Sequence, residues 1–488
     1  MNPLKKLAGE TVVYGFSSIV ARMLNYLLVV IYTRVFTAEE YGIINELYAY
    51  AAFLIVILTY GMETGFFRFI NKQEEKKKVF STSLISLFYS SFLFISIVFL
   101  SHQPISEILG YEQYSILILL LGITVGIDAF STITFAKLRS ENRALKFVMI
   151  KVFNIGVNIL MNIFFLIFLP MIESAVPDSP VLIVYDPALG IGYVIIANLI
   201  STILTLLVLL KEIVKVKFSF SPGLLKNMLK YSFPLLLSGL AGTVNESVDR
   251  ILLRWRLPET VNAQEQLGIY GANIRIAVLM ILFIQMFRYA AEPFFFKYYD
   301  KSDSRDLYAR VMKYFIIAGI LIFLGITGFL DLFKHIIGSA FHEGLNVVPI
   351  VLFGNFLLGV YFNLSVWYKL TDNTKFGAYL AFTGATVTVT INYFFIPIYG
   401  YMASAWAHVA CYAIMCFLSY FIGMKYFTIP YDLKGILVYF AFAILIFTIS
   451  SLISLENEIV DYIFNALLIL IYCAFVIFRE KNEILKVR

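Results

Sequence analysis

Hydrophobic residues follow one another along this chain in long, nearly unbroken stretches, and short polar segments separate them. A helix that crosses a bilayer needs about 20 predominantly apolar residues. Fourteen stretches of this kind lie near residues 11–36, 41–67, 79–101, 113–136, 147–170, 189–210, 231–253, 269–294, 313–333, 345–368, 376–396, 401–424, 434–453 and 459–478. The first is too long for a signal-peptide core, so we expect it to remain as a span. The pattern therefore predicts an all-α polytopic membrane protein with 14 transmembrane helices.

The composition excludes an ordinary soluble protein. Hydrophobic residues make up 60% of the 488 positions and charged residues only 14%, whereas soluble domains are about 45–50% apolar and about 25% charged. The 47 Phe and 32 Tyr residues suit helix surfaces that face lipid or the membrane interface. The three cysteines, Cys411, Cys416 and Cys473, lie inside apolar stretches and offer neither a disulfide framework nor a zinc spacing.

The charges of the loops predict the orientation of the chain. With a cytoplasmic N-terminus and alternating spans, most of the 38 Lys and Arg residues fall in cytoplasmic segments, among them the group from Lys297 to Lys313. The outer loops contain only Arg34, Arg254, Arg256 and Lys334. This is the positive-inside rule, and it predicts a multi-pass protein of the inner (plasma) membrane with both termini in the cytoplasm. The net charge of +6 thus indicates orientation and contacts with membrane lipids, not a nucleic-acid partner.

Sequence signatures of enzymes are absent. The chain has no Walker loop, no dinucleotide-binding glycine motif and no HExxH, and its four histidines lack metal-ligand spacing. A membrane glycosyltransferase or polymerase would normally need large outer loops or metal-binding aspartates, but the longest outer loop, near residues 170–188, has only Glu173, Asp178 and Asp186 as acidic residues. We therefore predict that the protein is not an enzyme and has no metal or cofactor beyond a coupling ion.

Two parts of the chain repeat one another weakly but in order. The second span ends with Glu63-Thr64-Gly65-Phe66-Phe67-Arg68 and the eighth with Glu292-Pro293-Phe294-Phe295-Phe296-Lys297, so both have the sequence E-x-x-F-F-basic. Further matches in the same order pair Ser18 with Ser238, Asn25 with Asn245, Tyr41-Gly42-Ile43 with Leu267-Gly268-Ile269, Lys137 with Lys369, and Asn162 with Asn392. We predict that spans 1–6 and 7–12 are duplicated lobes in the same orientation, with a transport site between them.

The repeat also predicts how the chain is divided. The expected parts are an N-lobe at residues 1–215, an interfacial linker helix at 216–230, a C-lobe at 231–425, and spans 13 and 14 with a cytoplasmic C-terminus at 426–488. In the linker, an apolar face with Leu225 and Leu229 opposes a polar face with Lys226 and Lys230, which is typical of a helix that lies in the membrane interface.

Three stretches carry a resemblance to a known family. They run from Ala21-Arg22 through Tyr32-Thr33-Arg34 to Glu40-Tyr41-Gly42, from Lys137 to Asn142 before an asparagine-bearing span, and from Asn392 to Ala405. With these stretches and its 6+6+2 helix plan, the chain resembles the multidrug/oligosaccharidyl-lipid/polysaccharide exporter superfamily, and within it the polysaccharide-biosynthesis (O-antigen flippase-like) branch. The resemblance implies a transporter. In the related lipid-linked-sugar flippases, cavity arginines contact the substrate headgroup and the last two spans form a hydrophobic groove.

Polar residues within the spans indicate a candidate substrate site. An ionisable side chain at the middle of a bilayer costs about 2.5–3.5 kcal/mol on insertion scales, so its presence needs a reason. In the first span, Ser18, Arg22 and Asn25 share one helix face. The repeat places Asn245 on the equivalent face of the seventh span, and Asp249 extends this face by one turn. We expect the two faces to border a shared cavity.

Arg22 is the leading candidate for a contact with the substrate headgroup. A guanidinium group can hold a phosphate with two parallel hydrogen bonds, and Arg22 matches a first-span arginine of the resembled family. The alternative is a structural ion pair of Arg22 with Glu246 or Asp249. Arg275, in the outer part of the eighth span, is the second candidate for a cavity cation.

Asp249, Glu246 and Asp128 are candidates for binding a coupling ion, either Na+ or H+. For each of them a hydrogen bond to a neighbouring helix is an equally good interpretation, and Glu246 could instead neutralise Arg250 four residues later. The energy source of transport is therefore left open by the sequence.

Other polar and small residues have structural interpretations. Arg288 is expected to pair with Glu292, and Glu63, which matches Glu292 in the repeat, is expected to cap or pair in the same way. Lys151, Asn154, Asn158 and Asn162 form one stripe of the fifth span, and such stripes usually join helices. The sequences Gly61-x-x-x-Gly65 and Gly122-x-x-x-Gly126 predict close helix packing.

Together these features predict a flippase that moves a polyprenyl-(pyro)phosphate-linked oligosaccharide to the outer leaflet by alternating access. Its expected partners are this substrate, membrane lipids, and polymerases or glycosyltransferases of the same pathway. A cation-coupled multidrug exporter of the same superfamily is the main alternative, but it would need an acidic cavity. A scaffold that recruits pathway enzymes without transport is a further alternative.

Overall fold

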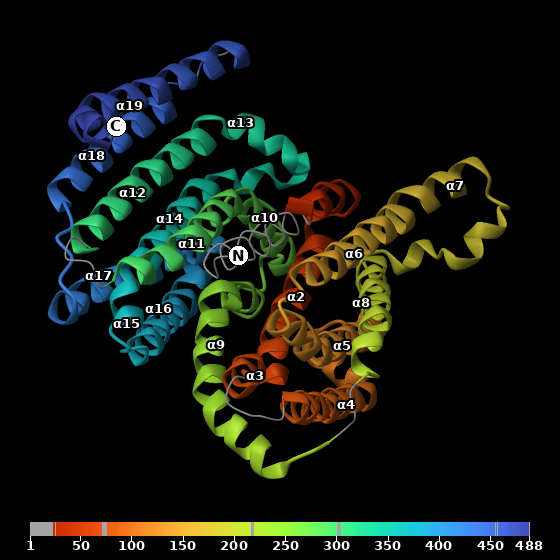
Figure 1. The fold of residues 1–488 in the computed structure, drawn as a ribbon. Helices are drawn as coiled ribbons and strands as arrows, with labels where there is room; N and C mark the ends of the chain where they lie inside the picture. Colours follow the sequence, from red (N-terminus) through yellow and green to blue (C-terminus); the bar gives the residue numbers. More distant parts are fainter. Residues whose placement is uncertain are drawn as a thin grey trace. The chain divides into compact units, whose positions relative to one another are not determined.

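The structure is a computed structural model that describes residues 23–24, 26–70, 76–215, 219–299, 304–453, 455 and 457–487. All regular elements in these ranges are helices (Figure 1). By their internal contacts they divide into two units: an N-terminal unit, Met1–Trp255 with Asn262–Gly268, and a C-terminal unit, Arg256–Val261 with Ile269–Arg488.

The N-terminal unit contains eight of the longer helices. They are α2 (Ala38–Thr59), α3 (Met62–Ile70), α4 (Lys76–Leu109), α5 (Ser115–Ser140), α6 (Ala144–Ile163), α7 (Leu169–Ala175), α8 (Gly192–Ile213) and α9 (Pro222–Arg256). Helix α2 begins with a capping box, in which Thr37 accepts from the backbone of Glu40 and the Glu40 carboxylate accepts from the backbone of Thr37. The unit packs chiefly through the pairs α4·α5, α5·α8, α6·α8 and α2·α5.

After the segment Arg256–Val261, the C-terminal unit resumes at Ile269 within α10 (Ala263–Ile276). It continues with α11 (Val278–Tyr298), α12 (Ser304–Gly328), α13 (Leu330–Phe333), α14 (Val347–Leu364), α15 (Val366–Leu370), α16 (Lys375–Tyr399), α17 (Tyr401–Tyr426), α18 (Leu433–Leu452) and α19 (Glu458–Val487). Besides α12·α18, which attaches the first of the two last helices, its main contacts are α12·α14, α14·α17, α16·α17 and α11·α14. By the predicted numbering of the spans, these are the same four pairs as in the N-terminal unit: 3·4, 4·6, 5·6 and 2·4 of each half.

Twelve helices in the described part of the chain are long and apolar enough to cross a membrane. They correspond to the predicted spans 2–6 and 8–14, which confirms a polytopic, helical membrane protein. Half of the first predicted span, residues 11–22 and 25, lies outside the described residues. The seventh lies in α9, which is 35 residues long and continuous with the predicted linker helix, but carries Glu246, Asp249 and Arg250 among its apolar residues. The count of 14 and the lobe boundaries stay predictions.

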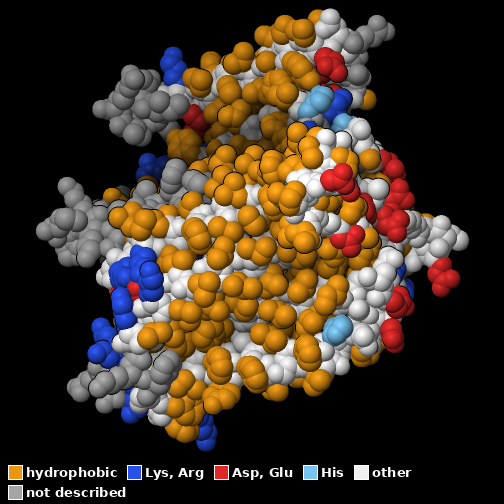
Figure 2. All heavy atoms as spheres, turned by 90° about the vertical axis from the view of Figure 1, so that its right-hand side faces the viewer, with side chains coloured by type: hydrophobic (Ala, Val, Ile, Leu, Met, Phe, Trp, Pro, Cys, Tyr) orange, Lys and Arg blue, Asp and Glu red, His pale blue; other side chains and the backbone are white. Residues whose placement is uncertain are grey.

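The surface agrees with a membrane location. On the face drawn in Figure 2, hydrophobic side chains cover most of the described surface. Exposed Phe92, Leu100 and Phe417 are among the large apolar side chains that packing leaves uncovered. Such a surface is unfavourable in water and suits lipid.

Glycines allow the close helix contacts that the sequence predicts. A Cβ atom at Gly65 of α3 would lie 2.5 Å from the Ser232 hydroxyl of α9, and one at Gly126 of α5 would lie 2.7 Å from the Ile95 side chain of α4. Both distances are shorter than a Cβ atom tolerates. The predicted packing role of the two glycine motifs is therefore confirmed at these positions.

A buried ion pair attaches the last helix to the C-terminal unit. Lys313 Nζ of α12 lies 2.7 Å from Glu480 Oε2 of α19, and the two side chains are only 8% and 6% exposed. The Tyr439 hydroxyl of α18 donates to the same carboxylate. The loop-charge pattern places Lys313 among the cytoplasmic orientation signals, but its side chain is buried within the helix packing because a carboxylate 167 residues away neutralises it.

Candidate functional site

The predicted substrate residues of the first span, Ser18, Arg22 and Asn25, lie outside the described residues. Their predicted counterparts are described. Asn245 and Asp249 lie one turn apart on α9 and are both buried, and Asp249 Oδ1 accepts a hydrogen bond of 2.9 Å from the Arg250 backbone. The two side chains thus share one helix face, as the spacing predicts. Their role in binding stays a prediction.

Arg275 is half-buried in the last turn of α10, in the C-terminal unit. Arg288, on the following helix α11, donates a hydrogen bond of 3.3 Å to Glu292, which confirms the predicted pair within one helix. Lys369 lies 2.6 Å from the same carboxylate. In the N-terminal unit Glu63 pairs with Arg139, so both carboxylates of the E-x-x-F-F motifs pair with a cation, as expected.

Asp128 belongs to a polar network in the N-terminal unit. Its side chain is exposed on α5 and accepts a hydrogen bond of 3.3 Å from Thr202 of α8. The Lys151 ammonium of α6 attracts the carboxylate electrostatically and lies 4.2 Å from the centre of the Phe135 ring. Three transmembrane helices therefore contribute to the surroundings of one accessible carboxylate.

The asparagine stripe of α6 continues this network. Asn154 donates a hydrogen bond of 2.9 Å to the Thr205 hydroxyl of α8. Asn162 is fully buried. It accepts a hydrogen bond of 2.9 Å from the Tyr32 hydroxyl and donates one of 3.0 Å to Asn158 Oδ1. The predicted role of the stripe in joining helices is confirmed for Asn154 and Asn162.

Sequence reasoning missed one link of the network. Asn198 of α8 donates a hydrogen bond of 2.9 Å to the Tyr48 hydroxyl of α2. Asn198 has Ser201 and Thr202 at helical spacing, but its partner Tyr48 is 150 residues away on another helix, so no local pattern marks the pair. With Asp128 and Thr202 they supply carboxylate, hydroxyl and amide oxygens, which are the ligands that hard cations prefer. The described residues hold no group of three or more metal-ligand side chains, and a coupling role for Asp128 stays a prediction.

A second polar cluster surrounds Glu46 of α2, which is 0% exposed. Its carboxylate accepts from the Tyr111 hydroxyl and, at 3.0 Å, from the Tyr50 hydroxyl. Arg254 Nε of α9 lies 3.7 Å away, and Trp255 Nε1 donates 2.8 Å to Tyr50. The cluster therefore ties the end of α9 to α2. It was not predicted, because Glu46 and Arg254 are far apart in the sequence.

Next to this cluster, α2 and the start of α10 meet at two glycines. A Cβ atom at Gly268 would overlap the Ala38 carbonyl and lie 3.0 Å from the Gly42 nitrogen. A Cβ atom at Gly42 would overlap the Gln264 carbonyl. Asn262 also donates 2.9 Å to the Glu39 carboxylate. Gly42 and Gly268 are matched positions in the predicted repeat, and the structure brings them into contact.

A cluster of charges lies where α5, α6 and α8 come together. Glu212 is 2% exposed and accepts two hydrogen bonds from Arg143, at 2.6 and 2.9 Å. Lys146 contacts the same carboxylate, and Lys137 donates 3.1 Å to the Glu212 carbonyl. The bonds to Glu212 raise the pKa of the Arg143 guanidinium above its usual value, so Arg143 stays charged. The cluster fixes the connection between α5 and α6.

Comparisons with known proteins agree with this fold. Residues 7–299 match the family described as polysaccharide biosynthesis protein. The structure is similar to "Lipid II flippase MurJ, inward closed conformation", with a TM-score of 0.74 and 16% sequence identity over 97% of this chain and 100% of that chain. No curated protein sequence gives a significant match.

Transporters of the MOP superfamily are also similar in structure. An inward-facing multidrug resistance MATE family transporter has a TM-score of 0.60 and 14% identity, with 85% of this chain and 95% of that chain covered. A MOP superfamily transporter from Pyrococcus furiosus, described as having a binding pocket of reverse polarity, has a TM-score of 0.56 and 15% identity, with coverage of 86% and 95%. These structures are transporters by name, and they share the fold. With the family match over more than half of its length, the chain belongs to the polysaccharide biosynthesis protein family.

Proposed function

We propose that this protein is a flippase that moves a polyprenyl-(pyro)phosphate-linked oligosaccharide from the cytoplasmic to the outer leaflet for cell-surface polysaccharide biosynthesis. The family membership carries this proposal, and the similarity of the fold to a lipid II flippase supports it. The polyprenyl tail stays in the lipid while the sugar and the phosphates cross through the protein. The protein lies in the inner membrane with both termini in the cytoplasm, as the distribution of Lys and Arg predicts.

The transport cycle is alternating access by two lobes of six helices each, at residues 1–215 and 231–425, with the linker helix at 216–230 and two extra helices at 426–488. The matching helix pairs of the two halves support this duplication. The close contact of Gly42 with Gly268 joins helix ends that the orientation places at the outer side. In this cycle, the contact closes the outer side and separates when substrate leaves to the outer leaflet.

The substrate site comprises Arg22, Arg275, Ser18, Asn25, Asn245 and Asp249. Arg22 and Arg275 supply cationic guanidinium groups for the phosphate oxygens, and the other four supply further polar contacts. The burial of Asn245 and Asp249 on one face of α9 supports a shared surface at that helix.

A Na+ or H+ gradient drives the cycle, with Asp128, Asp249 and Glu246 as the candidate coupling groups. Asp128 has the best support, because its side chain is exposed and accepts a hydrogen bond from Thr202, and because Tyr48 and Lys151 of neighbouring helices interact with it electrostatically. Polymerases and glycosyltransferases of the pathway supply the substrate and use the product.

The proposal is tested by leaflet transfer in proteoliposomes. The purified protein is reconstituted with a fluorescent polyprenyl-pyrophosphate-linked oligosaccharide, and the label accessible to a membrane-impermeant quencher is followed over time. We expect transfer that depends on the protein, and no transfer of the same glycan on a diacylglycerol anchor. Absence of transfer for every polyprenyl-linked glycan, in a protein that is folded, contradicts the proposal and favours a scaffold.

A cation-coupled multidrug exporter is the second candidate, because MATE transporters share the fold and Asp128 is an accessible carboxylate. This function predicts efflux of cationic dyes that is driven by a Na+ or H+ gradient. Asp128→Asn or Asp249→Asn should abolish this efflux. The cavity arginines Arg22 and Arg275 favour an anionic substrate instead.

A further inference from the structure

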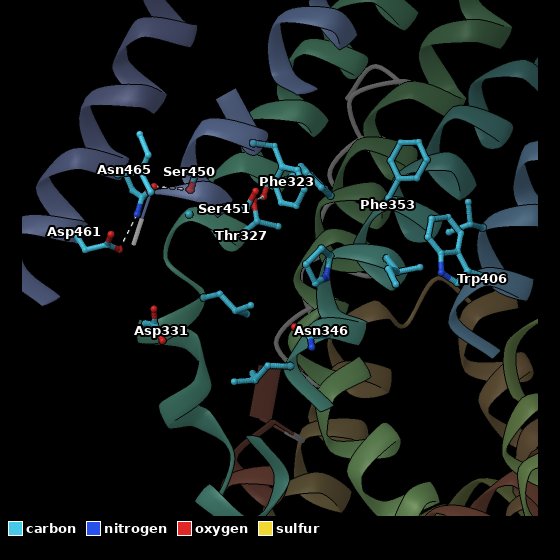
Figure 3. Close-up of a pocket in the computed structure, with 18 residues that line it drawn as sticks. Phe323, Thr327, Asp331, Asn346, Phe353, Trp406, Ser450, Ser451, Asp461 and Asn465 are labelled. Atoms are coloured by element: carbon cyan, nitrogen blue, oxygen red, sulfur yellow. Dashed lines mark hydrogen bonds between the residues drawn. The ribbon is translucent and has the colours of Figure 1, made fainter. Parts of the chain in front are cut away.

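The C-terminal unit contains a cavity of about 600 Å³ among α12, α14, α17, α18 and α19 (Figure 3). Its walls are largely apolar and include the aromatic side chains of Phe323, Phe353, Phe447 and Trp406. Trp406 is 56% exposed, so the cavity is open at the surface. The volume is that of a binding site for a small molecule or for part of a lipid.

One end of the cavity is polar. The Ser450 hydroxyl of α18 donates a hydrogen bond of 2.6 Å to Asn465 Oδ1 of α19, and the Asn465 amide donates one of 2.9 Å to Asp461 Oδ2. Asn465 is 4% exposed, and its side-chain oxygen and nitrogen are both used within this chain of hydrogen bonds. Asp461 ends the chain, and its half-buried carboxylate lies at the edge of the cavity in Figure 3. A bound molecule would therefore meet an acceptor there.

The charge of Asp461 is not neutralised by a neighbouring side chain. No Lys or Arg side chain that the structure describes lies within 4.0 Å of it, and its other hydrogen bond comes from the Leu455 backbone at 3.4 Å. Asp331, the second acidic residue of the cavity, differs because Lys334 lies 2.6 Å from it. An occupant with a cationic group is favoured at Asp461, and an anionic group is disfavoured.

The cavity lies in the outer half of the membrane in the predicted orientation. Its residues come from the end of α12, the start of α14, the start of α17, the end of α18 and the start of α19. With the basic loops in the cytoplasm, all five positions belong to the outer leaflet side. A molecule in this cavity therefore enters from the outer leaflet.

We propose that this cavity binds an outer-leaflet phospholipid with an amine headgroup. Its acyl chain packs against Phe323, Phe353 and Phe447, and its ammonium group binds the Asp461 carboxylate. A polyprenyl phosphate would fit the apolar walls equally well, but it would bring its phosphate next to Asp461. The site is thus distinct in charge from a substrate path, and it does not depend on which glycan the protein carries.

The test is native mass spectrometry of the full-length protein released from vesicles with equal amounts of phosphatidylethanolamine and phosphatidylglycerol. We expect the wild type to retain phosphatidylethanolamine about fivefold more than phosphatidylglycerol, since an exposed ion pair supplies a preference of this order. Asp461→Asn should abolish this preference. Glu458→Gln is the matched control: it removes the same charge one turn earlier on α19, where the side chain is exposed and does not line the cavity, and it should keep the preference.

A second variant separates the cavity from unspecific lipid binding. Ile350→Trp fills the space between α14 and the aromatic wall and should reduce retention of both lipids, while the thermal stability of the protein shows that it remains folded. Equal retention of the two lipids by the wild type, or an unchanged preference in Asp461→Asn, overturns the proposal. The proposal is also overturned if polyprenyl phosphate displaces the bound phospholipid equally well from the wild type and from Asp461→Asn. The cavity would then belong to the substrate path.

Discussion

Gly268 and Gly42 face each other where α10 crosses α2, and neither position has room for a Cβ atom. A Cβ atom on Gly268 would overlap the Ala38 carbonyl and lie 3.0 Å from the Gly42 nitrogen. The two glycines are matched positions in the predicted repeat, and their close approach depends on the absence of side chains. Bonds from Asn262 to Glu39 and from Arg254 to Glu46 surround this contact.

Gly268→Ala should therefore favour the conformation in which α2 and α10 are apart. Overpacking of a close contact costs about 1–3 kcal/mol, and each 1.4 kcal/mol changes a conformational equilibrium about tenfold. The measurement is the labelling rate of Ala38→Cys by a membrane-impermeant maleimide added from outside. Ala38 is buried beside Gly268, so we expect faster labelling in the Gly268→Ala background.

Gly156→Ala provides the control for this substitution. Gly156 lies in α6, and a Cβ atom there would meet no other atom within 4 Å. The control variant should label at the wild-type rate. An unchanged rate in Gly268→Ala, with folded protein in both cases, would show that this glycine contact does not hold the outer side closed.

The Lys313–Glu480 pair should be important for the stability of the C-terminal unit. Both side chains are almost fully buried, and removing one partner of a buried pair costs about 3–5 kcal/mol because it leaves the other charge without compensation. Glu480→Gln should therefore lower the thermal stability clearly. Asp331→Asn, which removes a partner of the exposed Lys334 pair, should cost less than about 1 kcal/mol.

Replacing both partners distinguishes this explanation from a loss of packing. The double variant Lys313→Met with Glu480→Leu removes both charges and should recover most of the stability. Thermal unfolding of the detergent-solubilised proteins gives the stabilities of the wild type, Glu480→Gln and the double variant. If the double variant is no more stable than Glu480→Gln, the unpaired charge is not the cause of the loss.

The spans were predictable because the length of an apolar stretch is a local property of the sequence. For the same reason the pair Arg288–Glu292 and the helix-joining role of Asn154 could be predicted. The environment of Glu46 could not, because its partners Tyr111 and Arg254 come from distant segments. The partner of Lys313 is 167 residues away, and in the sequence this lysine is indistinguishable from an orientation signal. The repeat marked Gly42 and Gly268 as equivalent, but only the structure shows that equivalent positions touch.

Asp128→Asn should uncouple transport from its driving ion if Asp128 is the coupling group. Asparagine keeps an oxygen that can accept from Thr202, but it removes the charge that attracts Lys151 and a bound cation. We expect flipping by the wild type to respond to an imposed Na+ or H+ gradient, and flipping by Asp128→Asn to be independent of it. Asp186→Asn, in the loop before α8, should respond as the wild type does. A full gradient response in Asp128→Asn would move the coupling role to Asp249 or Glu246.

In the predicted repeat, the register that pairs Asn25 with Asn245 also pairs Arg22 with Gly242, so only the first half of the sequence brings a cation to this position. If Arg22 binds the headgroup, Arg22→Ala should abolish flipping while the protein remains folded in the membrane. Arg22→Lys keeps the charge but loses the planar guanidinium group that binds phosphate with two bonds, and it should retain part of the activity.

The structural alternative predicts a different set of outcomes. If Arg22 only neutralises Glu246 or Asp249, Arg22→Ala should lower the thermal stability by leaving a carboxylate without its cation, and a second substitution, Glu246→Gln or Asp249→Asn, should restore it. Leaflet transfer and thermal unfolding measured on the single and double variants separate the two roles. Full flipping activity in Arg22→Ala would exclude Arg22 from the headgroup site and leave Arg275 as the cation to test next.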